Sequence, residues 1–501
     1  MKLSDLIIDV QSLEIKGVPA IEITSLGLNS QTATNGQLFF ALRGEKADGH
    51  HFIEAAVAKG AAAVVCEQLP EKQEEKVCYV VVKNSHAAMG KIAATFYGNP
   101  SKRLQLVGVT GTNGKTTTAT LLYRLFRALG YKAGLLSTVT NFVDNMEIPA
   151  THTTPDAITL NKLLAEMVRA GCAYCFMEVS SHAIVQERIA GLHFAGALFS
   201  NITHDHLDYH KTFSEYIRAK KLFFDNLPDT AFALVNVDDR NGRVMVQNTK
   251  AKVKTYALHS LADFHCRIIE KSFEGMQLQI DGMDVWTPFI GVFNAYNLLA
   301  VYATAQLLGV EKNEALRLLS AMTPVAGRFE KVHGTQQTKP AQPLSVGHFP
   351  LTVIVDYAHT PDALQNVLNT INDIRREEQL VTVAGCGGNR DAAKRPVMAC
   401  IAADNSDKVI FTSDNPRFEE PETILADMKA GLDAAQRSKS LFITDRREAI
   451  RTALMLAQSG SAIVLIAGKG HETYQEIKGK RIHFDDKETA RELLHELKQI
   501  K

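Results

Sequence analysis

The sequence predicts an α/β protein with three domains, and three observations support this fold class. The chain has 501 residues, which is too long for one hydrophobic core. Short apolar runs that suit buried strands alternate with helical patterns along the chain. Polar turns follow several of these runs, as they do at the carboxyl ends of parallel strands. We expect a small α/β domain over residues 1–100, a central domain with a mostly parallel sheet over 101–331, and a Rossmann-like α/β domain over 332–501.

The composition narrows the class of protein. Hydrophobic residues make up 46% of the chain and charged residues 22%, so there is ample material for a core and disorder is not expected. Lys plus Arg and Asp plus Glu both total 55, so no global field favours nucleic acid or an anionic membrane. The seven cysteines form no regular framework, and the N-terminus lacks the basic start of a signal peptide. We expect a cytoplasmic monomer that binds neither nucleic acid nor membrane.

The first hundred residues alternate short apolar runs with loops. Residues 37–42 and 61–66 suit buried strands, and the stretch from Phe52 to Lys59 has a helical pattern. The turn-forming cluster at residues 97–101 marks the end of this part. These features predict a small α/β domain and leave its purpose open.

A strand, a glycine loop and a helix follow one another between residues 104 and 130. Gln105–Thr110 suits a buried strand, and the apolar spacing after Lys115 is helical. Gly111 and Gly114 allow a tight turn whose N–H groups converge on an anion, and Lys115 adds a positive charge. Thr116 has a hydroxyl that can reach Mg²⁺. The segment predicts a nucleoside triphosphate site, although the P-loop pattern would have glycine where the chain has Val109.

Candidate metal ligands follow the P-loop. Glu178 ends an apolar run, at the position where a strand next to a P-loop strand can hold Mg²⁺; a helix-capping acid is the alternative. Residues 201–210 contain three histidines, His204, His206 and His210, with acids between them. Alone this pattern suggests zinc, whereas the P-loop and Glu178 favour magnesium. Lys220 lies on an amphipathic helix, where a lysine is ordinarily a solvated surface charge.

The last part of the chain repeats the α/β alternation. Its expected strands cover residues 351–355, 380–384, 409–412, 441–444 and 463–467. Polar groups gather after four of the strands, at residues 356–359, 390–391, 414–417 and 468–472. Residues 385–390 lack the third glycine of a dinucleotide fingerprint, so no nicotinamide site is expected. Four polar strand ends in one domain predict a shared site.

Several motifs together resemble the Mur ligase family, whose members build the peptide stem of bacterial cell-wall precursors. Gly111–Thr117 resembles the family's ATP loop, and Asp205–Asp208 resembles its Asp-His-Leu-Asp motif. Ala219–Lys220, Val325–Glu330 and Asp414–Arg417 match further motifs in family order. The resemblance spans essentially the whole chain. It implies a UDP-binding N-terminal domain, a P-loop ATPase-like central domain and an amino-acid-binding C-terminal domain.

The resemblance also implies functional residues by motif matching. The expected ATP contacts are Gly111, Thr112, Asn113, Gly114, Lys115, Thr116, Thr117, Asn294, Asn297 and Arg328. The expected contacts to the UDP-linked precursor are Leu28, Ser30, Thr153, Thr154, Ser180, Gln186 and Arg188. The expected diaminopimelate contacts are Arg390, Asp414, Asn415, Pro416, Arg417, Gly468 and Glu472. The expected catalytic residues are Lys115, Glu178, His206 and Lys220, and the expected Mg²⁺ ligands are Thr116, Glu178, His206 and Lys220, the last as a carbamate (N6-carboxylysine).

The implied reaction is ATP-dependent amide formation in peptidoglycan synthesis. The γ-carboxylate of D-glutamate on UDP-N-acetylmuramoyl-L-alanyl-D-glutamate becomes an acyl phosphate, and an amine of meso-2,6-diaminopimelate displaces the phosphate. Chemistry supports this amine, because Arg417 can bind the distal carboxylate of diaminopimelate, whereas it would repel the ammonium of lysine. Asn29-Ser30-Gln31 replaces the family's Asp-Ser-Arg, so the chain departs from the family at the diphosphate contacts.

Two other functions remain possible from the sequence. A folylpolyglutamate-synthase-like ligase would share the ATP domain, but it gives no reason for the N-terminal domain or for residues 414–417. A P-loop nucleotide switch would use the nucleotide only for conformational control. Phosphate release that requires both precursor and amino acid would exclude the switch.

Overall fold

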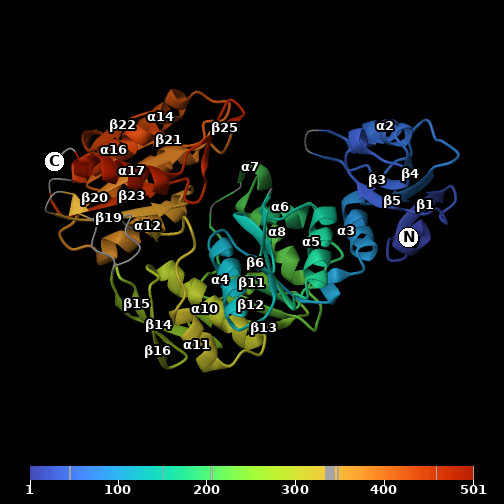
Figure 1. The fold of residues 1–501 in the computed structure, drawn as a ribbon, viewed down its shortest axis with the longest axis horizontal. Coiled ribbons are helices and arrows are strands. Elements are labelled where there is room, and N and C mark those ends of the chain that lie inside the picture. The colour runs from blue at the N-terminus through green and yellow to red at the C-terminus, as the bar shows by residue number, and fades with distance from the viewer. Residues whose placement is uncertain are drawn as a thin grey trace.

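The computed structural model describes residues 1–499 except 45–46, 151, 204, 206, 333–344, 347–348 and 458–459. Its helices and strands form three α/β units, each built around its own main sheet. In Figure 1 the N-terminal unit (blue) lies at one end of the molecule, the central unit in the middle and the C-terminal unit (orange and red) at the other end. The prediction of an α/β fold with three domains is confirmed.

The N-terminal domain has a five-stranded sheet in the order β1-β5-β4-β3-β2. Its strands are β1 (Ser12–Lys16), β2 (Ser25–Gly27), β3 (Gln37–Phe40), β4 (Ala61–Cys66) and β5 (Cys78–Val82). Its helices are α1 (Leu3–Leu6), α2 (Ile53–Ala58) and α3 (Ser85–Phe96), with short 3₁₀ turns at Ser30–Thr32 (η1), Gly49–Phe52 (η2) and, after α3, Pro100–Lys102 (η3). The expected strand at 61–66 and the expected helix near 52–59 are confirmed as β4 and α2.

The central domain has an eleven-stranded sheet in the order β16-β15-β14-β13-β12-β11-β6-β10-β7-β8-β9. Its strands are β6 (Gln105–Thr110), β7 (Ala133–Leu136), β8 (Thr140–Val143), β9 (Met146–Pro149), β10 (Tyr174–Glu178), β11 (Gly196–Phe199), β12 (Phe232–Asn236), β13 (Lys252–Ala257), β14 (Phe264–Lys271), β15 (Met276–Ile280) and β16 (Met283–Thr287). Its helices are α4 (Lys115–Ala128), α5 (Ala157–Arg169), α6 (Ser181–Val185), α7 (Leu207–His210), α8 (Phe213–Asp225), α9 (Gly242–Met245), α10 (Val292–Leu307) and α11 (Lys312–Ser320). The strands from β7 to β14 in sheet order pair in parallel, so their carboxyl ends share one edge.

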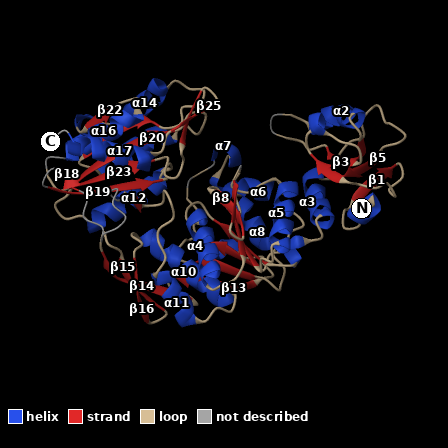
Figure 2. Ribbon diagram, viewed as in Figure 1, coloured by secondary structure: helices blue, strands red, loops and turns tan. Residues whose placement is uncertain are grey.

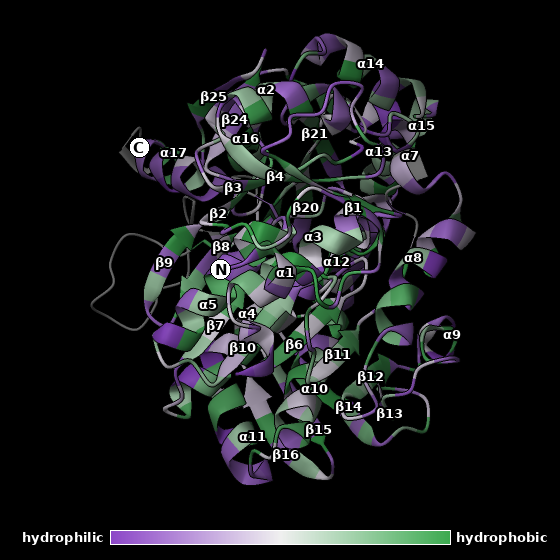
Figure 3. Ribbon diagram, turned by 90° about the vertical axis from the view of Figure 1, so that its right-hand side faces the viewer, coloured by the Kyte–Doolittle hydropathy of each residue, from purple (hydrophilic) through white to green (hydrophobic). Residues whose placement is uncertain are grey.

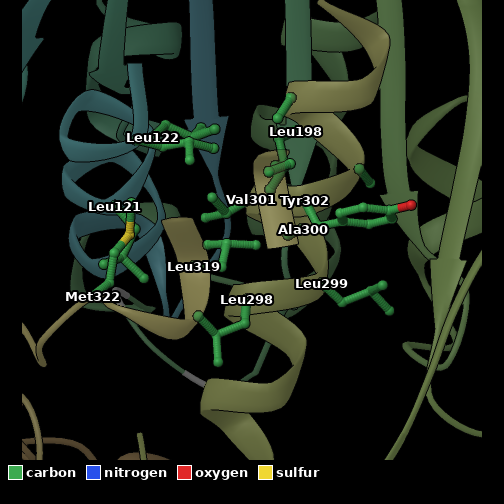
Figure 4. Packing of buried hydrophobic residues seen from close by; sticks show 14 of the residues in the cluster. Leu121, Leu122, Leu198, Leu298, Leu299, Ala300, Val301, Tyr302, Leu319 and Met322 are labelled. Carbon is green, nitrogen blue, oxygen red and sulfur yellow. The ribbon is translucent and has the colours of Figure 1, made fainter. Parts of the chain in front are cut away.

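Apolar packing fixes the glycine loop of the central domain. Helices α4 and α10 cover one face of the sheet, where Leu121 and Leu122 of α4 join Leu298 and Val301 of α10 in one buried cluster (Figure 4). Burying one such side chain stabilises the fold by about 1.5–3 kcal/mol. Helices α5 and α8 cover the opposite face with a second cluster. Because β6 and α4 are both held in this core, the loop that joins them is held at a fixed place on the sheet edge.

The C-terminal domain has a seven-stranded sheet whose main path is β17-β19-β23-β20-β21-β22, with β18 beside β19. Its strands are β17 (Glu330–Lys331), β18 (Ser345–Val346), β19 (Phe349–Asp356), β20 (Gln379–Cys386), β21 (Lys408–Ser413), β22 (Ser440–Phe442) and β23 (Ala462–Ala467), and β24 (Tyr474–Ile477) and β25 (Lys480–His483) form a separate hairpin. Its helices are α12 (Pro361–Ile374), α13 (Lys394–Asp404), α14 (Pro421–Ala430), α15 (Ala434–Ser438), α16 (Arg446–Leu456) and α17 (Asp486–Gln499). All five expected strands are present, with β22 ending before 443–444 because Asp445 caps the next helix.

Helices cover the surface of the molecule, and two of them, α3 and α5, join the first two domains. In Figure 3 the helices α11 and α14 carry both hydrophilic and hydrophobic residues, and Figure 2 shows helices around the strands in each domain. Among the described helices, none combines the length and the hydropathy needed to cross a bilayer. Helix α3 packs against α5, and Ala157 of α5 belongs to the buried cluster of the N-terminal domain.

Candidate active site

A cavity of about 1240 Å³ lies between the central and C-terminal domains. The glycine loop after β6, the end of β10 and helix α10 line it from the central domain. The ends of β19, β21 and β23 line it from the C-terminal domain. Carboxyl ends of parallel strands from two sheets therefore face one space, the usual position for a ligand site in such folds.

The glycine loop has the backbone that a phosphate cradle requires. Gly111 and Gly114 adopt φ angles of 152° and 87°, a region that favours glycine. A Cβ atom at Gly114 would lie 2.5 Å from Asn297 Oδ1, so a side chain there would force the Asn297 side chain to shift. Lys115 Nζ donates to the carbonyl oxygens of Gly111 at 2.9 Å and Thr112 at 2.8 Å. Desolvation lowers the Lys115 pKa, and Glu178 opposes that effect.

Hydrogen bonds lock the loop to the neighbouring strand end. The amide N–H of Asn113 donates to Asn201 Oδ1 at 2.9 Å, and Asn201 Nδ2 donates to the carbonyl oxygen of Asn113 at 3.1 Å. Asn113 Nδ2 donates to Asp362 Oδ2 of the C-terminal domain at 2.8 Å, and Thr203 Oγ1 donates to the same oxygen at 3.2 Å. Residues 112–117 all line the cavity, whereas Gly111 does not.

The two asparagines of α10 lie against this loop. Asn294 and Asn297 are buried, and Asn297 Nδ2 donates to Asn294 Oδ1 at 3.2 Å. Gly291 is the N-cap of α10, so neither asparagine caps the helix. Asn297 lines the cavity and Asn294 stands behind it.

Arg328 reaches the loop from the connection between the two domains. Its Nη2 donates to Thr116 Oγ1 at 3.3 Å, and its guanidinium carbon lies 4.4 Å from the centre of the Tyr357 ring. Its Nε is buried and has no hydrogen-bond partner among the described residues. The sequence motif that singled out Arg328 therefore places a cation beside the glycine loop.

Glu178 fits a metal ligand better than a helix cap. The side chain is buried, and Oε1 accepts from the Thr138 amide at 2.7 Å. Oε2 is buried without a partner among the described residues. Ser180, not Glu178, caps α6. An unpartnered carboxylate oxygen and the Thr116 hydroxyl on one cavity wall are the oxygen donors that Mg²⁺ prefers.

Of the three histidines in residues 201–210, the structure describes only His210. His206 and His204 lie outside the described residues, so the choice between zinc and magnesium ligands in 201–210 receives no geometry. His210, which is described, is buried and its Nε2 lies 2.9 Å from Ser181 Oγ. Among the described residues, no group of three or more His, Cys, Asp and Glu side chains is placed to hold a metal.

Lys220 is buried beneath the glycine loop, so the interpretation of Lys220 as a surface lysine is wrong. Its side chain is 1% exposed, and Nζ donates to the Gly111 carbonyl oxygen at 2.8 Å and to Thr110 Oγ1 at 3.4 Å. Nζ also lies 4.9 Å from the centre of the Tyr216 ring. Desolvation, and then the charge of Lys115, lower the Lys220 pKa well below its usual value. The amphipathic pattern of α8 led to the wrong exposure for Lys220, because this lysine lies on the buried face of the helix.

The expected precursor contacts fall into separate places. Thr153 and Ser180 line the cavity. Arg188 Nη1 donates to the Thr154 carbonyl oxygen at 2.7 Å and Arg188 Nε donates to Gln186 Oε1 at 3.0 Å, so these three residues form a linked group outside the cavity lining. Leu28 and Ser30 belong to the N-terminal domain. In Figure 1 the central domain lies between the N-terminal domain and the C-terminal domain. The structure therefore does not bring Leu28 and Ser30 to the cavity.

Two strand ends of the C-terminal domain form a compact polar cluster. Asn415, after β21, donates from Nδ2 to Glu472 Oε2 at 2.7 Å. Gly468, after β23, has φ of 122°, and a Cβ atom there would lie 2.6 Å from Asp414 Oδ2. Burial, and then the charge of Asp414, raise the Glu472 pKa. The structure thus brings four of the seven expected diaminopimelate contacts together.

The remaining three occupy different positions around this cluster. Arg417 adopts a positive φ of 54°, and its Nη1 donates to the Gly388 carbonyl oxygen at 2.7 Å. Its Nε lies 3.9 Å from Glu476 Oε2. Arg390 is exposed and lines the cavity, whereas Pro416 is buried and does not. Arg417 and Arg390 therefore supply two guanidinium groups to the same wall.

Several residues of the site were not selected from the sequence. Lys469 Nζ donates to Asn415 Oδ1 at 3.1 Å, and Tyr357 donates to Glu472 Oε1 at 3.4 Å. Burial raises the pKa of Asp356 to about 6 and lowers that of His359 to about 4. The sequence carried a signal for them, because all four lie at or just after the ends of β19 and β23, in the polar stretches 356–359 and 468–472.

Comparisons with known proteins identify the family of the chain. Family models match residues 22–97 (Mur ligase family, catalytic domain), 109–305 (Mur ligase middle domain) and 344–470 (Mur ligase, glutamate ligase domain). A relative from Cytophaga hutchinsonii, UDP-N-acetylmuramoyl-L-alanyl-D-glutamate--2,6-diaminopimelate ligase, is 57% identical over 99% of this chain and 100% of its own length. A solved structure of a ligase with the same name has 32% identity and a TM-score of 0.69, and the match covers 99% of both chains.

A more distant neighbour bears on the fold alone. The folylpolyglutamate synthase of Mycobacterium tuberculosis, solved with ADP and AMPPCP, has 16% identity and a TM-score of 0.60, covering 81% of this chain and 95% of that one. The resemblance first drawn from sequence motifs is confirmed by the family models and by the relative at 57% identity. The chain belongs to the Mur ligase family.

Proposed function

We propose that the protein is an ATP-dependent ligase that adds meso-2,6-diaminopimelate to UDP-N-acetylmuramoyl-L-alanyl-D-glutamate in peptidoglycan synthesis. Relatives of 57% and 32% identity over the whole chain carry this activity in their names. One observation carries the proposal: the glycine loop and the Asn415–Glu472–Arg417 cluster line the same cavity. A site for a triphosphate and a site for a charged amino acid are thus combined in one space.

The first step transfers a phosphoryl group. An oxygen of the D-glutamate γ-carboxylate attacks the γ-phosphorus, the bond to the β–γ bridging oxygen breaks, and ADP leaves. The N–H groups of the glycine loop, Lys115 and Arg328 stabilise the negative charge on the transferring group. Asn294 and Asn297 hold the loop and its nucleotide from the α10 side. Closing the cavity protects the acyl phosphate from water.

Mg²⁺ is the cofactor that this donor set fits. Bound Mg²⁺ would supply positive charge to the phosphate oxygens, and we propose two ions: Thr116 and Glu178 would hold the first, and His206 with carbamylated Lys220 would hold the second. The carbamate is supported by the surroundings of Lys220. A neutral buried amine can add to carbon dioxide and release one proton, which gives an anionic ligand. In the structure Nζ donates to the Gly111 carbonyl oxygen and to Thr110 Oγ1, and the charge of Asp205 opposes the lowering of its pKa.

The second step forms the amide bond. An uncharged amine of diaminopimelate attacks the acyl carbon, phosphate leaves from the tetrahedral intermediate, and the nitrogen loses a proton. Arg417, with Arg390, binds the distal carboxylate, and Glu472 with Asn415 and Asp414 receives the distal ammonium. Gly468 leaves room for the ligand because any side chain there would meet Asp414.

The precursor must bridge two domains in this proposal. Leu28 and Ser30 would bind its uridine diphosphate end, while Thr153, Thr154, Ser180, Gln186 and Arg188 would bind the muramoyl-dipeptide. We further propose the domain limits 1–100, 101–331 and 332–501, although β17 already pairs with β19 of the last sheet. The protein would act as a monomer in the cytoplasm, and buried unpaired cysteines support a reducing compartment.

The alternatives have less support. The folylpolyglutamate synthase shares the fold at 16% identity, and that level carries no substrate. A nucleotide switch leaves the Asn415–Glu472–Arg417 cluster without a purpose.

The test measures phosphate release and the mass of the product with ATP, the UDP-linked dipeptide and either diaminopimelate or lysine. We expect release that requires all three substrates and prefers diaminopimelate. A preference for lysine would refute the proposed specificity, and release without the amino acid would refute the ligase.

A further inference from the structure

Lys469 is a fully buried lysine at the centre of the C-terminal cluster. Its side chain is 0% exposed, and it follows Gly468 at the end of β23. Nζ lies 3.1 Å from Asn415 Oδ1, 3.3 Å from Glu472 Oε2 and 3.9 Å from Asp414 Oδ1. A buried ammonium group costs free energy unless such partners surround it. Every one of its polar partners is a residue of the proposed amino-acid site.

The first consequence concerns the orientation of Asn415. Its Oδ1 accepts from Lys469 Nζ and from the Glu476 amide at 2.9 Å. Two donors on the oxygen fix which end of the amide is which, so Nδ2 must face Glu472 Oε2 at 2.7 Å. Lys469, together with the Glu476 amide, therefore sets the direction of the Asn415 amide, and through its contact with Oε2 it also holds the Glu472 carboxylate.

The second consequence concerns charge. Asp414 and Glu472 are two carboxylates in one poorly solvated corner, where like charges favour protonation of one of them. Arg446 faces the same corner but is paired bidentately with Asp486 at 2.7 Å. The rings of Tyr357 and Tyr474 add no cation. Among the described groups that face Glu472, Lys469 is thus the cation that is not already paired with a carboxylate outside this corner. Its charge lowers the Glu472 pKa.

We propose that Lys469 is a positioning residue of the amino-acid site, which holds Asn415 and the Glu472 carboxylate in the arrangement that receives the ammonium of a diamino acid. This inference rests on the proposed function. Counted formally, two carboxylates and one ammonium leave the corner one net negative charge, which matches one incoming ammonium. The guanidinium of Arg417 then takes the carboxylate beside it, which matches the two charges at the distal end of diaminopimelate.

The test compares full-length wild type with Lys469→Met, Lys469→Arg and the matched control Lys480→Met, whose lysine is exposed on β25. KM is measured for each substrate, and kcat/KM for diaminopimelate is measured as a function of pH. In Lys469→Met we expect KM for diaminopimelate to rise about tenfold or more, the factor of a lost charge-assisted contact, with KM for ATP unchanged. The acid limb should move up by roughly 1–3 pH units, because an opposite charge has been removed.

Lys469→Arg should keep the acid limb near that of wild type while raising KM for diaminopimelate, since the charge remains and the geometry changes. Lys480→Met should behave as wild type. An unshifted acid limb in Lys469→Met, or equal increases in KM for all three substrates, would overturn the inference. If Lys469→Met does not fold, a shifted limb in Lys469→Arg would overturn it instead. Failure of wild type to join diaminopimelate would refute the proposed function and is distinguished by the wild-type measurement.

Discussion

Removing the guanidinium of Arg417 should weaken binding of diaminopimelate far more than binding of ATP. Arg417 gives Nη1 to the Gly388 carbonyl oxygen, which holds the group in place and leaves its other N–H groups for a carboxylate. A hydrogen bond to a charged group contributes about 1.5–3 kcal/mol. The side chain is 23% exposed, so a value in the lower half of this range applies. We expect Arg417→Ala to lose about 2 kcal/mol, which is about a 30-fold increase in KM for diaminopimelate.

The assay follows phosphate release while each substrate is varied in turn. Arg417→Lys should recover only part of the loss, because an ammonium cannot bind a carboxylate in the bidentate way. Arg376→Ala, which removes an exposed arginine outside the cavity, is the matched control and should equal wild type. The preference for diaminopimelate over lysine should fall in Arg417→Ala. Equal increases in KM for ATP and diaminopimelate would show that Arg417 does not recognise the distal carboxylate.

Three further predictions concern buried groups. Lys220→Ala should abolish turnover while the circular dichroism spectrum stays that of wild type, and near-normal turnover would remove the carbamate from the mechanism. Burial raises the pKa of Asp356 to about 6, so this carboxyl favours folding below about pH 4 and the contribution is lost as the pH rises through 6. The loss in the free energy of unfolding is about 3 kcal/mol at most. Denaturant unfolding at pH 4 and pH 7 should show this loss in wild type and not in Asp356→Asn. Arg446→Met should lower the free energy of unfolding by about 3–5 kcal/mol, because it leaves Asp486 buried without its partner, and the double variant with Asp486→Leu should recover most of it.

Sequence patterns predicted the local parts of this molecule well. The strand, loop and helix around Lys115 were predictable because hydrophobic period and glycine position depend on neighbouring residues. Lys220 and Lys469 were not predictable from pattern alone. A lysine is ordinarily exposed, and both are buried only because oxygen atoms from distant segments surround their ammonium groups. The position of Leu28 and Ser30 away from the cavity depends on packing between domains, which no local pattern encodes.

The contact between Asp362 and Asn113 links nucleotide binding to the position of the C-terminal domain. Asp362 lies in the first turn of α12, and its Oδ2 accepts from the side-chain Nδ2 of Asn113 in the glycine loop at 2.8 Å. Asp362 thus occupies the side-chain donor of Asn113, beside the loop that we assign to phosphate binding. Its negative charge would repel a bound phosphate. Burial raises the Asp362 pKa, which is the response of a carboxylate short of solvent. Leu364, Leu368 and Ile371 of α12 are buried in one cluster with residues of the C-terminal sheet, so a shift of α12 on nucleotide binding would carry the sheet, and with it the diaminopimelate cluster.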